Sequence, residues 1–437
     1  MLRRAYVRTT TRGCIMTSRW VWLISRVTRR IWLRATLFSI LAVATALVAI
    51  VVSPYIPVGL STKIGADAVD NILGIIASSM LTVTTFSLST MVSAYSAATT
   101  NVTPRATRLV MEDSTTQNVL ATFIGSFLFS LVGIIALTTG AYGEQGRIVL
   151  FFVTIGVIVV IVVTLLRWID HLSRLGRVTE TTQRVEAATV KALRASKSAP
   201  HLGGQPLDAA SGRIGHPNHP IFSSDIGYVQ HVDAAALSAI AEEAEIDISV
   251  VAIPGKLADP SEAIAWSSGG LDDELTHRIA SCFTIADTRS FEQDPRFGAS
   301  VLSEIASRAL SPAVNDPGTA IDVISRALRI LAVWVEPQED PERSSEVRYP
   351  RLHVVPIRLQ DLFDDLFTPI ARDGAGLVEV GLRLQKTFKA LSRMSEREFR
   401  LDAARHSREA LARAEASLHI EADKQRIRDA ALMPSAD

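Results

Sequence analysis

The chain has 437 residues, of which 48% are hydrophobic, and its 45 basic and 45 acidic residues give a formal net charge of zero. A neutral chain offers no overall electrostatic attraction for nucleic acid, so we expect no nucleic-acid partner. The two cysteines, Cys14 and Cys282, lie far apart, on opposite sides of the most apolar region. Neither a disulfide framework nor a thiolate metal site fits that usage.

Apolar stretches in the first 170 residues predict four membrane spans, at roughly 31–52, 69–98, 119–141 and 148–166. A helix needs about 20 apolar residues to cross a hydrocarbon core about 30 Å thick, and the second stretch is longer than that. We therefore expect a basic N-terminal segment at 1–30 and a four-helix transmembrane region at 31–170.

Lys and Arg are distributed unevenly over the segments that flank these spans. Nine arginines and no acidic residue lie between Met1 and Arg34. The connection between the second and third spans contains two arginines and the segment after the fourth contains three, whereas the only Lys or Arg residues of the two other connections are Lys63 and Arg147. Because cytoplasmic flanks are enriched in Lys and Arg, we expect both termini and everything after residue 170 in the cytoplasm. Met16 is an alternative start, since residues 1–15 add only basic sequence.

Hydroxyl side chains recur every three or four residues along the second predicted span, at Ser78, Thr82, Thr85, Ser89, Ser93, Ser96 and Thr100. On a helix this spacing forms one stripe. Either the hydroxyls bond to their own helix or to adjacent helices, or the stripe lines a hydrated pathway to which each subunit of an oligomer contributes one helix. No charged residue or histidine lies at the centre of any predicted span, which argues against a coupled pump.

Two arginines follow the stripe. Thr103-Pro104 is expected to end or bend the helix, and Arg105 and Arg108 then lie where anionic headgroups are available. The alternative is a ring of cations at a pore mouth that attracts anions.

The remaining chain has the composition of a soluble protein. Residues 171–224 are predicted to form a linker, 225–394 an α+β domain and 395–437 a C-terminal helix and tail. His216 and His219 lie in a Pro-rich stretch with no carboxylate or thiol cluster nearby, so we expect no metal and no cofactor. The fold class expected for the whole chain is a membrane α-helical bundle followed by a cytoplasmic α+β domain that is mostly helical.

Two Asp-Pro pairs each predict the start of a helix. Asp294 and Asp316 are placed as N-caps, and the proline after each takes the first helical position. The two helices form a predicted hairpin, and Asp294, Asn315 and Asp316 make a candidate ligand-binding turn if the helix starts are close. The plain alternative is a capped tight turn.

Three stretches of the soluble part resemble a prokaryotic family of predicted membrane proteins of unknown function: GYVQ at 227–230, EQDPRFG at 292–298 and, most specifically, ALSPAVNDPGTA at 309–320. The resemblance covers roughly residues 31–400. It implies an N-terminal membrane bundle with a cytoplasmic module and, for a prokaryotic protein, location in the inner membrane. It implies no activity, cofactor or catalytic residue.

The motifs of common enzyme classes are missing from the sequence. No Gly-rich phosphate loop, nucleophile elbow or metal-ligand spacing occurs, so we expect no enzyme. The leading hypothesis is an oligomeric, channel-like integral membrane protein whose partners are the lipid bilayer and further copies of itself. The alternative is a membrane-anchored sensor or scaffold whose cytoplasmic domain binds a ligand or protein. Transported species, ligand, subunit number and gating signal do not follow from the sequence.

Overall fold

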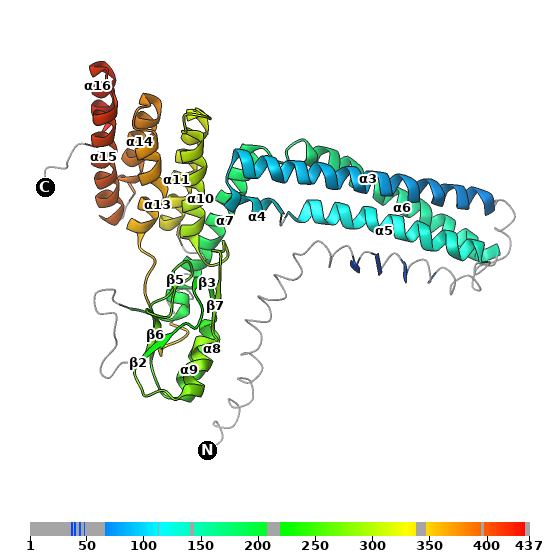
Figure 1. Ribbon diagram of the computed structural model, residues 1–437, viewed down its shortest axis with the longest axis horizontal. Coiled ribbons are helices and arrows are strands. Elements are labelled where there is room, and N and C mark those ends of the chain that lie inside the picture. The colour runs from blue at the N-terminus through cyan, green and yellow to red at the C-terminus, as the bar shows by residue number, and fades with distance from the viewer. Residues whose placement is uncertain are drawn as a thin grey trace. The chain divides into compact units, whose positions relative to one another are not determined.

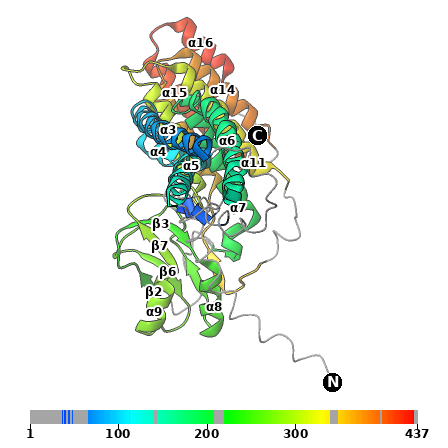
Figure 2. The same ribbon diagram turned by 90° about the vertical axis from the view of Figure 1, so that its right-hand side faces the viewer.

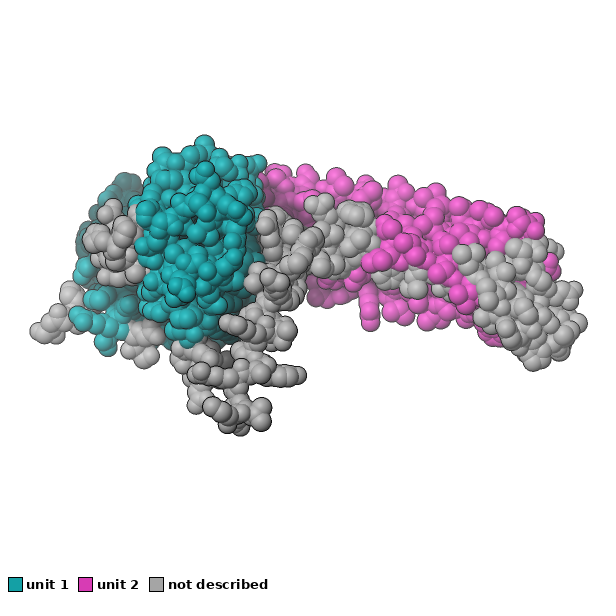
Figure 3. Space-filling model, turned by 90° about the horizontal axis from the view of Figure 1, so that it is seen from below, with its two compact units in different colours: residues 1–19, 182–437 teal, residues 20–181 magenta. Residues whose placement is uncertain are grey.

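The computed structural model describes residues 66–111, 113–139, 144–207, 219–337, 347–394 and 397–432, together with seven positions between 36 and 48. The chain divides into two compact units, unit 1 with residues 1–19 and 182–437 and unit 2 with residues 20–181 (Figure 3). The first predicted span, 31–52, lies largely outside the described residues.

Unit 2 is helical (Figure 1). Its described helices are α3 (Ala66–Asn101), α4 (Pro104–Met111), α5 (Ser114–Thr138) and α6 (Glu144–Leu172). By length and composition α3, α5 and α6 are able to cross a membrane, and they correspond to the second, third and fourth predicted spans. The described residues thus contain three of the four expected membrane helices.

The inward sides of these helices form two apolar clusters. Val69 and Leu73 of α3 pack with Phe129 of α5 and Leu150 of α6. Further along, Ile76, Met80, Phe123, Ile161 and Trp168 form the second cluster. With 36 residues, α3 is about 54 Å long, so it is longer than a hydrocarbon core is thick. As predicted, α3 ends before Pro104, which opens α4.

Helix α7 (Val178–Ser198) occupies part of the segment that was predicted to be a linker, so that prediction was wrong in this stretch. From Thr182 onward its residues belong to unit 1. Val185, Ala192 and Leu193 are buried. A Cβ atom at Gly298 would lie 1.9 Å from the Thr189 Oγ1, so α7 packs against that glycine at a distance that no other residue type permits.

Two sheets and two helices follow α7 and the short turn η3 (Pro200–Gly203). The five-stranded sheet has the order β1 (Gln205–Pro206), β8 (Leu352–Val354), β4 (Ile248–Val250), β6 (Ala263–Ser267) and β2 (His219–Phe222). Strands β1, β8 and β4 run parallel, and β4, β6 and β2 antiparallel. The three-stranded antiparallel sheet contains β5 (Leu257–Ala258), β3 (Gly227–Val232) and β7 (Phe283–Ala286).

Helices α8 (Ala234–Glu243) and α9 (Asp273–Ala280) lie beside the sheets (Figure 2). Asp233 caps α8 by accepting a hydrogen bond from the Ala236 amide, as its position in the sequence predicts. Leu237, Ile248 and Leu352 are fully buried members of one core that joins α8 to the five-stranded sheet. These elements therefore form a single α+β core.

The other helices of unit 1 stand side by side (Figure 1). They are α10 (Pro295–Ala309), α11 (Pro317–Val335), α13 (Leu359–Asp373), α14 (Val378–Leu391), α15 (Arg397–Ser417) and α16 (Glu421–Ala430). The segment 395–437, expected to contain one C-terminal helix, thus contains two in its described part, and Phe399, Ala403 and Ala410 are buried. The expected class, membrane helices followed by a region of helices and some sheet, is confirmed.

Candidate functional site: the hydroxyl face of α3

All seven residues of the predicted stripe are exposed on α3. At 3.6 residues per turn they fall within a sector of roughly 80°. The opposite side of α3 is buried against its neighbours, with Leu73, Ile76, Met80 and Met91 among the packed residues. The structure therefore gathers the seven residues on one face of α3 that turns away from the described neighbours of this helix. We refer to it as the hydroxyl face.

Bulky apolar side chains border the hydroxyl face on both sides. Ile75 and Phe86 lie along one margin, and Leu81, Leu88 and Val92 along the other. Each of these five residues is at least 48% exposed. The exposed side of α3 is thus polar in the middle and apolar at its edges.

In the N-terminal half of the stripe the hydroxyls bond to their own helix. Ser78 Oγ donates to the Ile75 carbonyl at 3.1 Å, Thr82 Oγ1 to the Ser78 carbonyl at 2.9 Å and Thr85 Oγ1 to the Leu81 carbonyl at 2.9 Å. Such bonds satisfy a hydroxyl without any partner outside the helix. These three residues fit the simpler interpretation of the stripe.

In the C-terminal half the situation differs. Ser89, Ser93, Ser96 and Thr100 are exposed, and none of the four hydroxyls has a hydrogen-bond partner within the described part of the chain. Hydrocarbon offers no partner to a hydroxyl, so these side chains are poorly suited to contact lipid tails.

Helix α6 provides the contrast within the same unit. Its exposed positions include Phe152, Val159, Val163, Leu166 and Ile169, all apolar. Thr154, by comparison, is buried and donates to the Leu150 carbonyl at 2.7 Å. The exposed side of α6 therefore has the composition of a lipid-facing helix, whereas that of α3 does not.

A buried polar cluster, which sequence reasoning missed, joins these helices. The indole Nε1 of Trp168 on α6 donates to Ser87 Oγ on α3 at 2.9 Å. The carboxylate of Asp113, the N-cap of α5, lies 2.8 Å from Nε2 of His171 and accepts a hydrogen bond from the Thr116 hydroxyl at 2.7 Å. Asp113 and His171 lie far apart in sequence, so the sequence does not indicate that they pair. The one available signal was that both lie near the ends of predicted membrane spans.

Arg105 and Arg108 lie on the short helix α4, where Arg105 is exposed and Arg108 half-buried. Their contact with headgroups or anions stays a prediction. A hydrogen bond of 3.0 Å between the hydroxyls of Thr99 and Thr107 connects α4 to the end of α3.

The candidate ligand-binding turn is not assembled. Asp294 precedes α10 and Asp316 follows it, so 15 helical residues, or about 22 Å, separate the two carboxylates. Asp316 caps α11 and accepts hydrogen bonds from the hydroxyl and amide of Thr319, which lower the pKa of its carboxyl. Asn315 takes the left-handed conformation (φ 50°) that asparagine tolerates in turns. The Asn315-Asp316 segment is thus the capped tight turn of the plain alternative, and the condition for a site shared with Asp294, close helix starts, is not met.

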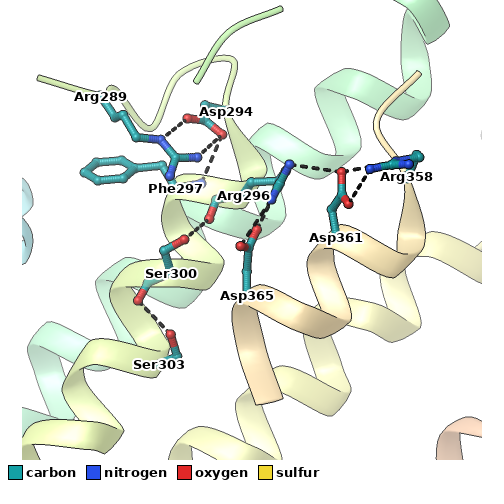
Figure 4. Close-up of polar contacts among 9 residues, drawn as sticks. All are labelled: Arg289, Asp294, Arg296, Phe297, Ser300, Ser303, Arg358, Asp361 and Asp365. Atoms are coloured by element: carbon teal, nitrogen blue, oxygen red, sulfur yellow. Dashed lines mark hydrogen bonds and ion pairs between the residues drawn. The ribbon is translucent and has the colours of Figure 1, made fainter. Parts of the chain in front are cut away.

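Asp294 instead belongs to a buried ion pair (Figure 4). Its side chain is 3% exposed and accepts hydrogen bonds from Arg289 Nε at 2.8 Å, Arg289 Nη2 at 3.0 Å and the Phe297 amide at 3.0 Å. Burial raises the pKa of the Asp294 carboxyl, against the opposing effect of Arg289. Gly255 (φ 97°) packs so closely that a Cβ there would lie 2.3 Å from Asp294 Oδ2.

Arg296 extends this arrangement to α13. Its guanidinium binds Asp365 at 2.7 Å and Asp361 at 3.0 Å, and Arg358 binds Asp361 at 3.0 Å (Figure 4). We call Arg289, Asp294, Arg296, Asp361 and Asp365 the ion-pair junction. Since every member has a partner of opposite charge, the junction holds elements together and presents no open ligand site.

Hydrogen bonds also tie strand β3, which contains the stretch 227–230, to the segment 288–293 just before α10. Gln230 Nε2 donates to the Thr288 carbonyl at 2.6 Å, and the Val232 amide donates to Gln293 Oε1 at 3.3 Å. Among the described residues, no group of three or more His, Cys, Asp or Glu side chains is placed to hold a metal ion.

Comparison with known proteins identifies relatives but no activity. The chain is 24% identical over 286 residues to the uncharacterized protein Rv1290c of Mycobacterium tuberculosis (strain ATCC 25618 / H37Rv) and equally to the uncharacterized protein Mb1321c of Mycobacterium bovis. Each match covers 60% of this chain and 51% of the relative, so the chain spans about half the length of these curated relatives. No solved structure matches. A family model matches residues 28–390, and the chain therefore belongs to the family described as predicted membrane protein (DUF2254).

Proposed function

We propose that the protein is an oligomeric, channel-like membrane protein in which the hydroxyl faces of α3 from neighbouring copies line a shared hydrated path. One observation carries this proposal. Helices α3 and α6 both expose a long side in unit 2, and the exposed side of α6 is apolar whereas that of α3 carries seven hydroxyls.

The chemistry of the hydroxyl face favours water or protein over lipid. Ser89, Ser93 and Ser96 have no partner within the described residues, and membrane hydroxyls are stable when they meet other helices or water. The apolar margins, with Phe86 on one side and Val92 on the other, supply the surface through which copies pack around such a path.

The charge pattern supports passive conduction. No charged residue lies between Asp70 and Arg105, and proton relays and voltage sensors are built from charged residues. A neutral path of hydroxyls suits a small hydrated solute that crosses without energy coupling. In this proposal unit 1 lies in the cytoplasm of a prokaryotic cell, which the enrichment of arginine in the flanks of the spans supports.

Recordings from purified full-length protein in planar bilayers test the proposal. We expect conductance under a salt gradient, and we expect Ser89→Leu/Ser93→Leu to remove most of it because two isobutyl groups replace two hydroxyls in the path. The matched control is Val159→Leu/Val163→Leu, which enlarges two exposed side chains of α6 and leaves conductance unchanged.

Two results would contradict the proposal. One is a monomeric mass in detergent together with no conductance under any gradient, which would leave a membrane-anchored sensor or scaffold. The other is a conductance that the α3 variant leaves intact while the α6 control removes it.

A further inference from the structure

Helix α14 exposes a row of basic side chains. Arg383, Lys386 and Lys389 on the helix and Arg393 in the turn after it are all exposed. Their spacing of three, three and four residues places them on one side of the helix. Phe388, the only aromatic residue of α14, is fully buried on the other side.

Among the described residues, these four cations differ from most arginines of unit 1 in having no carboxylate partner. On the adjacent helix α15, Arg405 binds Asp364 and Arg413 binds Glu409. No described carboxylate lies within salt-bridge distance of the four, although Glu379 is exposed one turn before Arg383.

Like charges at these spacings destabilise a helix. The chain as a whole is neutral, so the row is not the consequence of a general excess of basic residues. Repulsion among these cations lowers the stability of α14. An anionic partner that binds the row would offset this repulsion.

Helix α15, which packs against α14, begins with further basic residues. Arg397 and Arg400 lie in its first turns and are exposed, next to Glu398 and to Leu401, whose side chain is 60% exposed. We call this set of exposed residues on the two packed helices the basic face: Arg383, Lys386, Lys389, Arg393, Arg397, Arg400 and Leu401.

We infer that the basic face binds the surface of an anionic phospholipid bilayer. From Arg383 to Arg393 it extends about 15 Å along the helix, which matches an array of anionic headgroups better than a single small anion. Leu401 adds an apolar side chain among the arginines, a combination typical of proteins that lie at the headgroup boundary. A stacking surface for nucleic acid would instead present exposed aromatic side chains.

Attachment to a membrane strengthens the inference. The membrane helices of the same chain keep unit 1 near a bilayer, so each weak contact with headgroups acts at a high effective concentration. The inference does not depend on whether α3 lines a path.

Vesicle flotation with full-length protein in phosphatidylcholine nanodiscs tests it. We expect the discs to float with vesicles that contain phosphatidylglycerol and not with vesicles of phosphatidylcholine alone. Since each basic residue near an anionic surface contributes about 1 kcal/mol, Lys386→Gln/Lys389→Gln should weaken the binding roughly 25-fold. High salt should release the wild-type protein.

A matched variant removes the same charge from paired positions of unit 1. Arg372→Gln/Arg426→Gln neutralises two exposed arginines that are bound to Asp373 and Asp423, and it should leave vesicle binding almost unchanged. Thermal unfolding checks the fold, because Lys386→Gln/Lys389→Gln relieves repulsion and should melt no earlier than the wild type.

Vesicle binding that does not depend on phosphatidylglycerol would overturn the inference. So would vesicle binding that falls equally in Lys386→Gln/Lys389→Gln and in Arg372→Gln/Arg426→Gln. So would an α14 variant that loses a bound nucleic acid or acidic protein while its vesicle binding is unchanged. The basic face would then belong to that other partner.

Discussion

The hydroxyl face of α3 and the ion-pair junction of unit 1 both gather polar side chains, but they differ in where the partners of those side chains lie. At the junction, Arg289 and Arg296 each bind carboxylates of the same chain. On α3, Ser89, Ser93 and Ser96 have no partner among the described residues. Polar groups with internal partners hold the fold together, whereas polar groups without them point to partners outside the chain. Substitutions at the two regions should therefore affect different properties.

The largest expected effect is at the junction. Arg289→Met leaves the carboxylate of Asp294 buried without its cation, which should lower the free energy of unfolding of unit 1 by about 3–5 kcal/mol. Thermal or denaturant unfolding of the full-length protein measures this. Adding Asp294→Asn, which keeps a helix-capping acceptor, should recover part of the loss. An unchanged stability in Arg289→Met would show that the junction is not a structural contact.

The second effect depends on pH. His406 is 1% exposed among Phe363, Phe367 and Phe388, and burial lowers its pKa from 6.5 to about 4. The folded protein then binds fewer protons than the unfolded chain between these values. Stability should be full above pH 6.5 and decrease by up to about 3 kcal/mol as the pH falls toward 4.

Unfolding curves of wild type and His406→Gln over this pH range test the assignment. The variant lacks the imidazole, so its stability should change less between pH 6.5 and 4. If the stability of the two proteins changes equally with pH, His406 does not cause the loss of stability in acid.

A smaller effect is expected where α7 joins α11. Glu186 is partly buried, which acts to raise its pKa, but hydrogen bonds from Arg329 and Arg326 outweigh burial and leave the pKa lowered. This carboxylate therefore stabilises the fold above pH 4.5, and the contribution disappears as the pH falls through its lowered value.

Glu186→Gln should destabilise unit 1 by about 1–2 kcal/mol at pH 7 and have little effect in acid. Melting temperatures at the two pH values measure the difference. A loss of stability of the same size at both pH values would indicate that Glu186 contributes through packing and not through its charge.

The smallest effect on stability is expected on α3. Ser89→Leu/Ser93→Leu changes exposed side chains that have no partner among the described residues. The free energy of unfolding of the detergent-solubilised protein, followed by its melting temperature, should therefore change by no more than about 0.5 kcal/mol. Its consequence should appear in conductance alone. A large destabilisation would remove the distinction between the two regions.

Local signals predicted much of the fold. Asp294 and Asp316 each cap the helix that the sequence predicted to start there, because capping depends on neighbours within one turn. The hydroxyl periodicity of the second span likewise appears as one face of α3. These features need no knowledge of distant residues.

Contacts between distant residues were not predictable in the same way. Strand β4 pairs with β8, about 100 residues later, and Asp294 packs against Gly255 and binds Arg289. The sequence left open whether Asp294 approaches Asn315, and the intervening helix α10 keeps them apart. Helix α7 escaped prediction because half of its buried residues are threonines, which leaves only Val185, Ala192 and Leu193 as an apolar signal.

Thiol reactivity in the membrane tests the central claim most directly. In a variant without native cysteines, Ser96→Cys on α3 and Val159→Cys on α6 are exposed to a membrane-impermeant reagent and to an oxidant. The account predicts rapid labelling or a disulfide between two copies at position 96 and neither at position 159. If both positions react equally slowly and form no disulfide, the hydroxyl face of α3 contacts lipid tails and the proposed path does not exist.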